Sequence, residues 1–481
     1  MADTFPRQYA RTRRFTLGVP RAFTVFPDRV LFLRALSGSD PRTDLWMLDL
    51  AAGTERQIVD PAGLLDDADL PAAERARRER VRETATGVVS YAADAHGRVV
   101  AFPLGGRLWV ADIDAGSVQC LETAHDVYDP RPDSTGTTVA YVSGRSLRVT
   151  GVDGQHDREL LGADAEAVSW GRAEFVAAEE MNRMRGFWWG PDGSSLLVAR
   201  VDESAVPVWW IADPAHPDHA PTAVRYPVAG AANADVTLHV VDLSGHRREI
   251  TWDRNAFPYL ARVSWIADHP PLIQVQSRDQ RHVQVLAVEL SDGSTRVLVE
   301  DRDDVWVELF TGVPAWCGQD VVRIADVDGV RRLFVGEQAV TPDDIYVREV
   351  AGASDTRVVF TASVGDPTQV QVFEWTPDGI VPLTDEDGWH SATIGGDVTV
   401  LSSAGLGHVG FSHRVRWAGG DVAVSSCTET PLVTPTVRLL RLGARRLPAG
   451  LLLPTGHVPG TPLPVLLDPY GGPHAQRVLS T

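Results

Sequence analysis

Short apolar stretches separated by polar turns run along most of the chain. Residues 29–33 (RVLFL) and 45–50 (LWMLDL) are two apolar stretches followed by the turn pair Ala52-Gly53. Residues 99–102 and 108–112 repeat the same arrangement. Turn pairs of this kind join antiparallel strands. The pattern therefore predicts a chain built from β-hairpins.

The hairpin unit returns at a period of roughly 40 to 50 residues, which is typical of repeat architectures. Eight copies fit the sequence, at residues 23–60, 88–123, 129–161, 188–226, 260–300, 313–340, 350–383 and 391–426. This period favours a β-propeller over a β-sandwich, because each blade buries its faces only against its neighbours. We therefore predict an all-β fold, an eight-bladed β-propeller over residues 1–445, with tryptophans such as Trp46 and Trp109 in its core.

Two stretches interrupt the β pattern. Residues 71–84 (PAAERARRERVRET) are rich in helix formers and place Glu74 four residues before Arg78, so we expect a solvated helix inserted between blades. A basic docking patch is the alternative interpretation. Residues 173–185 (AEFVAAEEMNRMR) are also helix-prone and directly precede a strand that begins at Phe187.

The last segment has a different character. Residues 463–468 form an almost continuous apolar run that ends in the turn residues Pro469 to Pro473. Such a run is typical of a strand buried on both faces in an α/β domain. We predict a second domain over residues 446–481, of which the chain contains only the first strands.

Composition and charge exclude several classes of partner. Acidic residues outnumber basic ones, 64 to 45, which gives a net charge of −19 and disfavours nucleic acid or an anionic membrane as partner. No run is long enough to cross a bilayer, and no secretory signal is visible. The three cysteines form no C-x-x-C pair, which disfavours a disulfide framework or a zinc site. We therefore expect a soluble cytoplasmic protein.

Glu179 and Glu180 form the first candidate site. Two adjacent carboxylates repel each other unless a cation joins them, and a substrate ammonium group supplies that cation and charge-assisted hydrogen bonds. The alternative interpretation is the solvated face of a helix.

Tyr470 is the second candidate, at the turn after the apolar run and before Gly471-Gly472. In α/β-hydrolases a loop after an early strand supplies a donor to the oxyanion hole, and the tyrosine hydroxyl would serve as such a donor. An ordinary turn is the alternative. The sequence contains no G-x-S-x-G elbow and no H-E-x-x-H spacing, so we expect no metal, no cofactor and no Ser-His-Asp chemistry from this chain alone.

Four motifs together resemble a known family. They are AEFVAAEEM (173–181), FWWGPDG (187–193), VDESAVP (201–207) and RYPVAGAAN (225–233). In this order they are similar to the bacterial dipeptidyl peptidase IV branch of the prolyl oligopeptidase family, and DPYGGPHAQRV (468–478) resembles the start of that family's α/β-hydrolase domain.

The resemblance implies a propeller that caps a serine peptidase. Its substrates would be peptides with a free N-terminus and a penultimate proline or alanine. It implies that Glu179 and Glu180 bind the substrate's α-amino group, that Tyr470 contributes to the oxyanion hole, and that the full-length protein forms a homodimer. The Ser-Asp-His triad would lie beyond Thr481. A family arginine that assists substrate binding has no match that the sequence identifies.

Two other functions remain open from the sequence. The propeller could be an interaction module without catalysis, because propellers host many unrelated functions. Another peptidase of the superfamily, an endopeptidase or an acylaminoacyl peptidase, is a weaker alternative. The glutamate pair counts against it, because blocked or internal substrates offer no amine.

Overall fold

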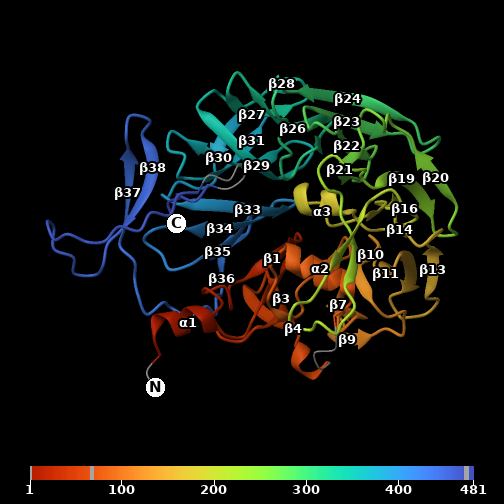
Figure 1. Ribbon diagram of the computed structural model, residues 1–481, viewed down its shortest axis with the longest axis horizontal. Helices are drawn as coiled ribbons and strands as arrows, with labels where there is room; N and C mark the ends of the chain where they lie inside the picture. The colour runs from red at the N-terminus through yellow and green to blue at the C-terminus, as the bar shows by residue number, and fades with distance from the viewer. Residues whose placement is uncertain (1–2, 65–69, 471–475) are drawn as a thin grey trace. The chain divides into compact units, whose positions relative to one another are not determined.

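A computed structural model describes residues 3–64, 70–470 and 476–481 of the chain. It divides into two compact units: unit 1 comprises Met1–Arg56 and Phe310–Thr481, and unit 2 comprises Gln57–Leu309. Antiparallel sheets of four or five strands make up the blades of both units (Figure 1). The chain has the eight-bladed β-propeller fold that the repeats predict.

Four blades belong to unit 2. The first consists of β6 (Ala92–Ala93), β7 (Val99–Leu104), β8 (Arg107–Asp112) and β9 (Ser117–Cys120). The second consists of β10 (Val127–Pro132), β11 (Thr138–Ser143), β12 (Ser146–Gly151) and β13 (Arg158–Leu161). The third consists of β14 (Val168–Trp170), β15 (Phe187–Trp189), β16 (Ser195–Asp202), β19 (Asp235–Asp242) and β20 (Arg247–Ile250). The fourth consists of β21 (Tyr259–Ser264), β22 (Leu272–Gln276), β23 (His282–Val288) and β24 (Thr295–Arg302). A separate hairpin consists of β17 (Val208–Ile211) and β18 (Thr222–Arg225), and we call it the arm.

The other four blades lie in unit 1, apart from residues 57–59 of the first of them, which belong to unit 2. One is built from β1 (Arg21–Val25), β2 (Arg29–Arg34), β3 (Arg42–Asp49) and β4 (Thr54–Val59), and the next from β25 (Ala315–Cys317), β26 (Asp320–Val327), β27 (Val330–Val335) and β28 (Gln338–Ala339). The last two are built from β29 (Ile345–Ala353), β30 (Val358–Val364), β31 (Gln371–Thr376) and β32 (Gly379–Pro382), and from β33 (Trp389–Gly395), β34 (Val398–Ala404), β35 (Ser412–Trp417) and β36 (Gly420–Val424).

The middle strands of the blades are buried on both faces. In β2, the consecutive residues Val30, Leu31, Phe32 and Leu33 are all 0% exposed. Packing on both faces explains why the sequence shows apolar runs there instead of strict alternation. Removing a side chain such as Phe32 from this position would cost about 3–5 kcal/mol.

The predicted repeats match the observed blades closely, with one exception. Residues 188–226 were predicted as one blade, but the corresponding blade runs from β14 to β20. The prediction was wrong there because two insertions divide this blade. A helix separates β14 from β15, and the arm separates β16 from β19.

The helical predictions are largely confirmed. The remaining elements are α1 (Phe5–Arg11), the short 3-10 helix η1 (Pro61–Gly63), α2 (Ala72–Arg80), β5 (Thr86–Gly87) and α3 (Phe175–Glu180). Glu74 of α2 does pair with Arg78 at 2.8 Å, as its spacing predicts, and also with Arg77 at 2.6 Å. Glu74 is only 3% exposed, however, so the description of α2 as a fully solvated helix was wrong.

The C-terminal part of unit 1 contains a second isolated hairpin, β37 (Val437–Leu442) and β38 (Leu447–Leu452). Arg446 lies in its turn, so the domain boundary suggested at residue 446 falls inside one hairpin and stays a prediction. Val465, Leu466 and Leu467 are 82%, 93% and 81% exposed and belong to no strand. A strand needs a neighbour for its backbone groups, and no described segment pairs with this run.

No helix of the described chain is both long and apolar enough to cross a membrane.

Candidate functional site

Helix α3 lies in an insertion between β14 and β15 of the β14–β20 blade, and we call the two chain segments that lead into and out of this insertion, at Arg172 and Arg185, the neck. Strands β14 and β15 both pair with β16, and the chain between them leaves the blade to form α3. An isolated antiparallel bridge between Arg172 and Arg185 closes the neck. At Gly186 a Cβ atom would lie 2.3 Å from the backbone nitrogen of Arg172, so only glycine allows the two chains to approach this closely.

The N-terminal end of α3 is fixed by a buried acid. The Glu174 carboxylate caps the helix by accepting a hydrogen bond from the Ala177 backbone N–H at 2.9 Å. It also lies 3.8 Å from Arg183, and both side chains are almost fully buried. Burial raises the pKa of Glu174 and lowers that of Arg183 to about 10, whereas the attraction between the two charges opposes both shifts. This pair therefore holds the helix in place.

The C-terminal end of α3 is held through its backbone and apolar side chains. Arg262 of β21 donates a hydrogen bond to the Met181 carbonyl oxygen, and Arg183 donates one to the Leu260 carbonyl oxygen at 2.9 Å. Met181 packs against Tyr259 in a small apolar cluster. The helix ends sooner than predicted because Asn182 adopts a left-handed conformation, with φ of 52°, a common way to stop a helix.

Glu179 and Glu180 occupy the last turn of this anchored helix, and both are exposed. The Glu179 Oε1 atom lies 2.7 Å from the Nε atom of Arg80, at the end of α2. The Arg80 guanidinium also lies over the Phe175 ring, 5.5 Å from its centroid. Within the described residues Glu180 has no hydrogen bond or ion pair, so its carboxylate is available to a ligand.

The charges at this helix end favour a cation. Of the two carboxylates, only that of Glu179 pairs with the Arg80 guanidinium, so the negative charge of Glu180 has no ion-pair partner among the described residues. The C-terminus of a helix carries partial negative charge as well. The arrangement of Glu179, Glu180 and Arg80 therefore suits an additional positively charged group with several N–H donors.

Sequence analysis did not find Arg80. The residue lies in the helix that was interpreted as solvated or as a basic patch, and it meets Glu179 across 99 positions of sequence. No local pattern reports a contact of that range. The only available signal was a surplus of arginines in α2 without nearby acids to neutralise all of them.

Three of the four sequence motifs meet beside α3. The rings of Phe175 and Tyr226 contact edge to face, with centroids 5.0 Å apart. Next to Tyr226, the Arg225 guanidinium donates hydrogen bonds to the backbone carbonyl oxygens of Glu203 at 2.9 Å and of Val206 at 3.0 Å. These contacts tie the arm and the β16–β17 turn to the helix that presents the glutamates.

A pocket of about 780 Å³ lies next to this assembly within unit 2. Its lining includes Arg80 and Phe175, which also contact each other, and Trp210 from the arm. The pocket walls carry charges of both signs, from Arg145, Arg172, Arg225, Asp126, Glu166 and Glu203. Such a lining suits a ligand with both donor and acceptor groups, as a peptide backbone has.

Tyr470 lies in unit 1 and is 48% exposed, in a segment without regular secondary structure. Its ring is 5.6 Å from the guanidinium carbon of Arg477. The glycines that follow it, Gly471 and Gly472, lie outside the described residues. The oxyanion-hole role of Tyr470 therefore stays a prediction.

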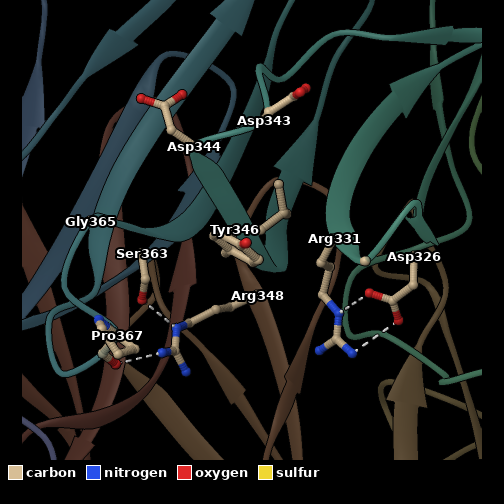
Figure 2. Close-up of a pocket in the computed structure, with 11 residues that line it drawn as sticks. Asp326, Arg331, Asp343, Asp344, Tyr346, Arg348, Ser363, Gly365 and Pro367 are labelled. Atoms are coloured by element: carbon tan, nitrogen blue, oxygen red, sulfur yellow. Dashed lines mark hydrogen bonds and ion pairs between the residues drawn. The ribbon is translucent and has the colours of Figure 1, made fainter. Parts of the chain in front are cut away.

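A second pocket, of about 640 Å³, lies in unit 1 and was not predicted from the sequence. Figure 2 shows Tyr346 between Arg331 and Arg348. Arg331 forms a two-atom ion pair with Asp326 at 3.0 and 3.1 Å, and Arg348 donates to the Ser363 hydroxyl at 2.9 Å. Because both guanidinium groups already have partners, this pocket is a weaker anion site than its composition suggests.

The fold and the site define a class: β-propeller domains that carry an acidic helix inserted into one blade. Residues 88–405 match the family model described as the dipeptidyl peptidase IV N-terminal region. The chain therefore belongs to this family.

Named relatives agree with that assignment. The chain is 23% identical over 418 residues to a probable dipeptidyl peptidase 4 of Trichophyton verrucosum (strain HKI 0517), covering 77% of this chain and 55% of the relative. It is 24% identical over 419 residues to a dipeptidyl peptidase 4 of Arthroderma otae, covering 77% of this chain and 53% of the relative. The matches thus span about half the length of these relatives.

A solved structure shows the same fold. The crystal structure of Porphyromonas gingivalis dipeptidyl peptidase 4 superposes with a TM-score of 0.77 over 100% of this chain and 71% of that chain, at 16% sequence identity.

Proposed function

We propose that this propeller binds the free α-amino group of a peptide through Glu179 and Glu180, as the substrate-anchoring region of a serine-type dipeptidyl peptidase. The observation that carries the proposal is the exposed carboxylate pair at the end of a helix whose other contacts are buried. A rigid support is what a binding group needs to hold a ligand in one geometry.

The charge balance supports an ammonium ligand over a neutral one. An α-ammonium group has three N–H donors and forms short, charge-assisted hydrogen bonds with carboxylates. Glu180 has no partner of its own in the described structure, and Glu179 shares its charge with Arg80. One ammonium group would neutralise the remaining negative charge.

The substrate class follows from the position of the anchor. If the amine is fixed at α3, the bond to be cut is counted from the peptide's N-terminus, so the product has a set number of residues. We propose peptides with penultimate proline or alanine as substrates, and the pocket lined by Phe175 and Trp210 as the place for the first residue's side chain. The names of the relatives, dipeptidyl peptidase 4, support this proposal.

Catalysis itself is proposed for a longer chain that includes a hydrolase domain of this family, with Tyr470 as an oxyanion-hole donor. The present sequence has no G-x-S-x-G elbow. We therefore expect no hydrolysis of a chromogenic Gly-Pro anilide by this chain, and hydrolysis by a chain that also carries the catalytic domain.

The direct test measures amine binding by the chain itself. Isothermal titration with an Ala-Pro-Ala tripeptide is compared with titration of its N-acetylated form. We expect binding of the free tripeptide only, with affinity reduced about tenfold to hundredfold in Glu180→Gln, since a hydrogen bond to a charged group contributes about 1.5–3 kcal/mol. Glu122→Gln, another exposed glutamate of unit 2, serves as the matched control and should bind normally.

Equal affinity for the free and acetylated peptides would refute an amine site. Absence of binding by either peptide would favour the alternative, an interaction module that recognises another protein. The exposed indoles of Trp209 and Trp210, at 51% and 67%, are the observation in favour of that alternative.

A further inference from the structure

The loop that connects the two strands of the arm brings together an aspartate and two histidines. It follows β17 and contains the sequence Asp213-Pro214-Ala215-His216-Pro217-Asp218-His219. The ligand atoms of Asp213, His216 and His219 all lie within 4.8 Å of one another. The three side chains are exposed and lie away from the glutamates of α3 in the sequence.

Two consecutive turns create this grouping. The His216 backbone N–H donates to the Asp213 carbonyl oxygen at 3.1 Å, and the His219 backbone N–H donates to the His216 carbonyl oxygen at 3.0 Å. Bonds that span three residues place side chains three positions apart on the same side, one above the other. Asp213, His216 and His219 are spaced by three, so the backbone itself aligns them.

Proline makes these turns rigid. Each turn has proline as its second residue, Pro214 in the first and Pro217 in the second, which is the position where a fixed φ favours a turn. The shape of the loop therefore does not depend on the two histidine side chains. Little backbone conformational entropy remains to be lost when the side chains bind a common ligand.

The two carboxylate oxygens of Asp213 have different partners. One carboxylate oxygen of Asp213, Oδ1, accepts the Ala215 backbone N–H at 2.9 Å and belongs to the turn. The other, Oδ2, lies 2.7 Å from Nδ1 of His216. The imidazole rings of His216 and His219 are nearly parallel, with centroids 5.0 Å apart. Because the three side chains are exposed, rotation of the two rings is enough to direct one nitrogen of each toward a shared point near Oδ2.

We propose that Asp213, His216 and His219 bind a divalent transition-metal ion of the zinc type. Two imidazole nitrogens and one carboxylate oxygen are a common ligand set for zinc, with ligand distances of about 2.0–2.2 Å and water in the open position. Imidazole also suits copper and nickel, whereas calcium and magnesium prefer sites made of oxygen alone. Sequence analysis did not assign this site because the three-residue spacing aligns ligands only in such turns.

The bound ion would fix the tip of the arm. Residues 212–221 join β17 to β18, and the metal would hold three points of this connection together. Trp209 and Trp210, whose indoles are exposed, lie four and three residues before Asp213, at the end of the arm strand that leads into the site. The site is independent of the proposed peptide function, since it shares no residue with α3 or its pocket.

Calorimetric titration of the chain with Zn²⁺ under reducing conditions tests the proposal. We expect the unaltered chain to bind one equivalent of zinc. In both His216→Ala and His219→Ala, zinc binding should be lost, or the zinc affinity should fall by more than the roughly 10–100-fold that removal of an outer-sphere partner costs. Asp242 and His246 provide the matched control: they are an exposed Asp-His pair, 3.3 Å apart, without a third ligand. His246→Ala should retain the equivalent.

A local readout distinguishes this site from the cysteines and the other histidines. Cu²⁺ bound at the loop should quench the fluorescence of Trp209 and Trp210, and the double variant Trp209→Phe/Trp210→Phe should lose that component of the quenching while still binding Zn²⁺. The proposal is overturned if His216→Ala and His219→Ala bind as much zinc, as tightly, as the unaltered chain. It is equally overturned if His246→Ala removes the same equivalent.

Discussion

The two ends of helix α3 carry the same residue type in opposite environments. Glu174 at the N-terminal end is 7% exposed, caps the helix and lies against a buried arginine. Glu179 and Glu180 at the C-terminal end are exposed. Among the described residues, Glu179 forms an ion pair with Arg80 and Glu180 forms none. The difference separates a carboxylate that maintains the fold from two that remain available for binding.

Replacing Glu174 tests the structural side of this comparison and should have the largest effect. Glu174→Ala leaves the buried Arg183 without its counter-charge and removes the helix cap, so we expect a loss of about 3–5 kcal/mol in the free energy of unfolding. Urea denaturation measures it. Glu180→Ala is the matched control and should cost less than about 0.5 kcal/mol. Similar losses in the two variants would abolish the distinction.

The same distinction between buried and exposed groups predicts a pH dependence. Burial lowers the pKa of His239 to about 4, below its ordinary value of 6.5, and that of His413 likewise. The unfolded chain therefore binds protons that the folded chain does not. Each histidine contributes stability that is present above pH 6.5 and is lost as the pH falls toward 4, up to about 3 kcal/mol each.

Denaturation curves recorded between pH 7 and pH 4 measure this slope. His239→Phe keeps an aromatic ring against Trp170, whose ring lies 5.0 Å away, and removes the titrating group, so the slope should become shallower. His246→Gln is the control because the His246 side chain is 90% exposed. An unchanged slope in His239→Phe would contradict the assignment.

The functional end of α3 is tested by combining its two glutamates. Glu179→Gln/Glu180→Gln should abolish the difference in affinity between a free and an N-acetylated tripeptide, because the charge that distinguishes the two ligands no longer has a partner. We expect an effect at least as large as the tenfold loss predicted for Glu180→Gln alone, and little change in stability. Retained selectivity for the free amine would place the amine site elsewhere.

Of these substitutions, Arg80→Ala should have the smallest effect on stability and binding, and it tests whether Arg80 competes with a ligand for the Glu179 carboxylate. A partly exposed ion pair contributes less than about 1 kcal/mol, so Arg80→Ala should lower stability only slightly. Its guanidinium competes with a ligand ammonium for Glu179, and its loss should raise affinity for the free amine about threefold. Arg75→Ala, on the exposed face of the same helix, is the control. Weaker binding in Arg80→Ala would instead indicate that Arg80 contacts the peptide.

Much of the fold was readable from the sequence because each blade is a local unit. Its strands are neighbours along the chain, so turn pairs and apolar runs report them directly. The blade from β14 to β20 escaped this reading because α3 and the arm interrupt it. Long insertions change the spacing of strands along the chain but leave their pairing intact. A prediction of blades from strand spacing therefore fails where such insertions occur.

The site was less predictable because its contacts are not local. The acidic pair was found from adjacency alone, but nothing in the sequence separated Glu174 from Glu179. Burial decides that difference, and burial of Glu174 depends on Arg183 and on packing against β21. The buried state of Glu74 in α2 was missed for the same reason.

The neck below α3 has a consequence for how such a domain diversifies. The Arg172–Arg185 bridge closes the blade beneath the insertion, and the pairing of β14 and β15 with β16 uses no residue of the segment 173–184. Evolution or an engineer can exchange that segment as a cassette and install a different recognition element on an unchanged scaffold. The cost falls on the groups that α3 covers or bonds: the apolar side chains of Tyr259 and Ala261, and the hydrogen bonds that Arg262 and the Leu260 carbonyl oxygen make to the segment.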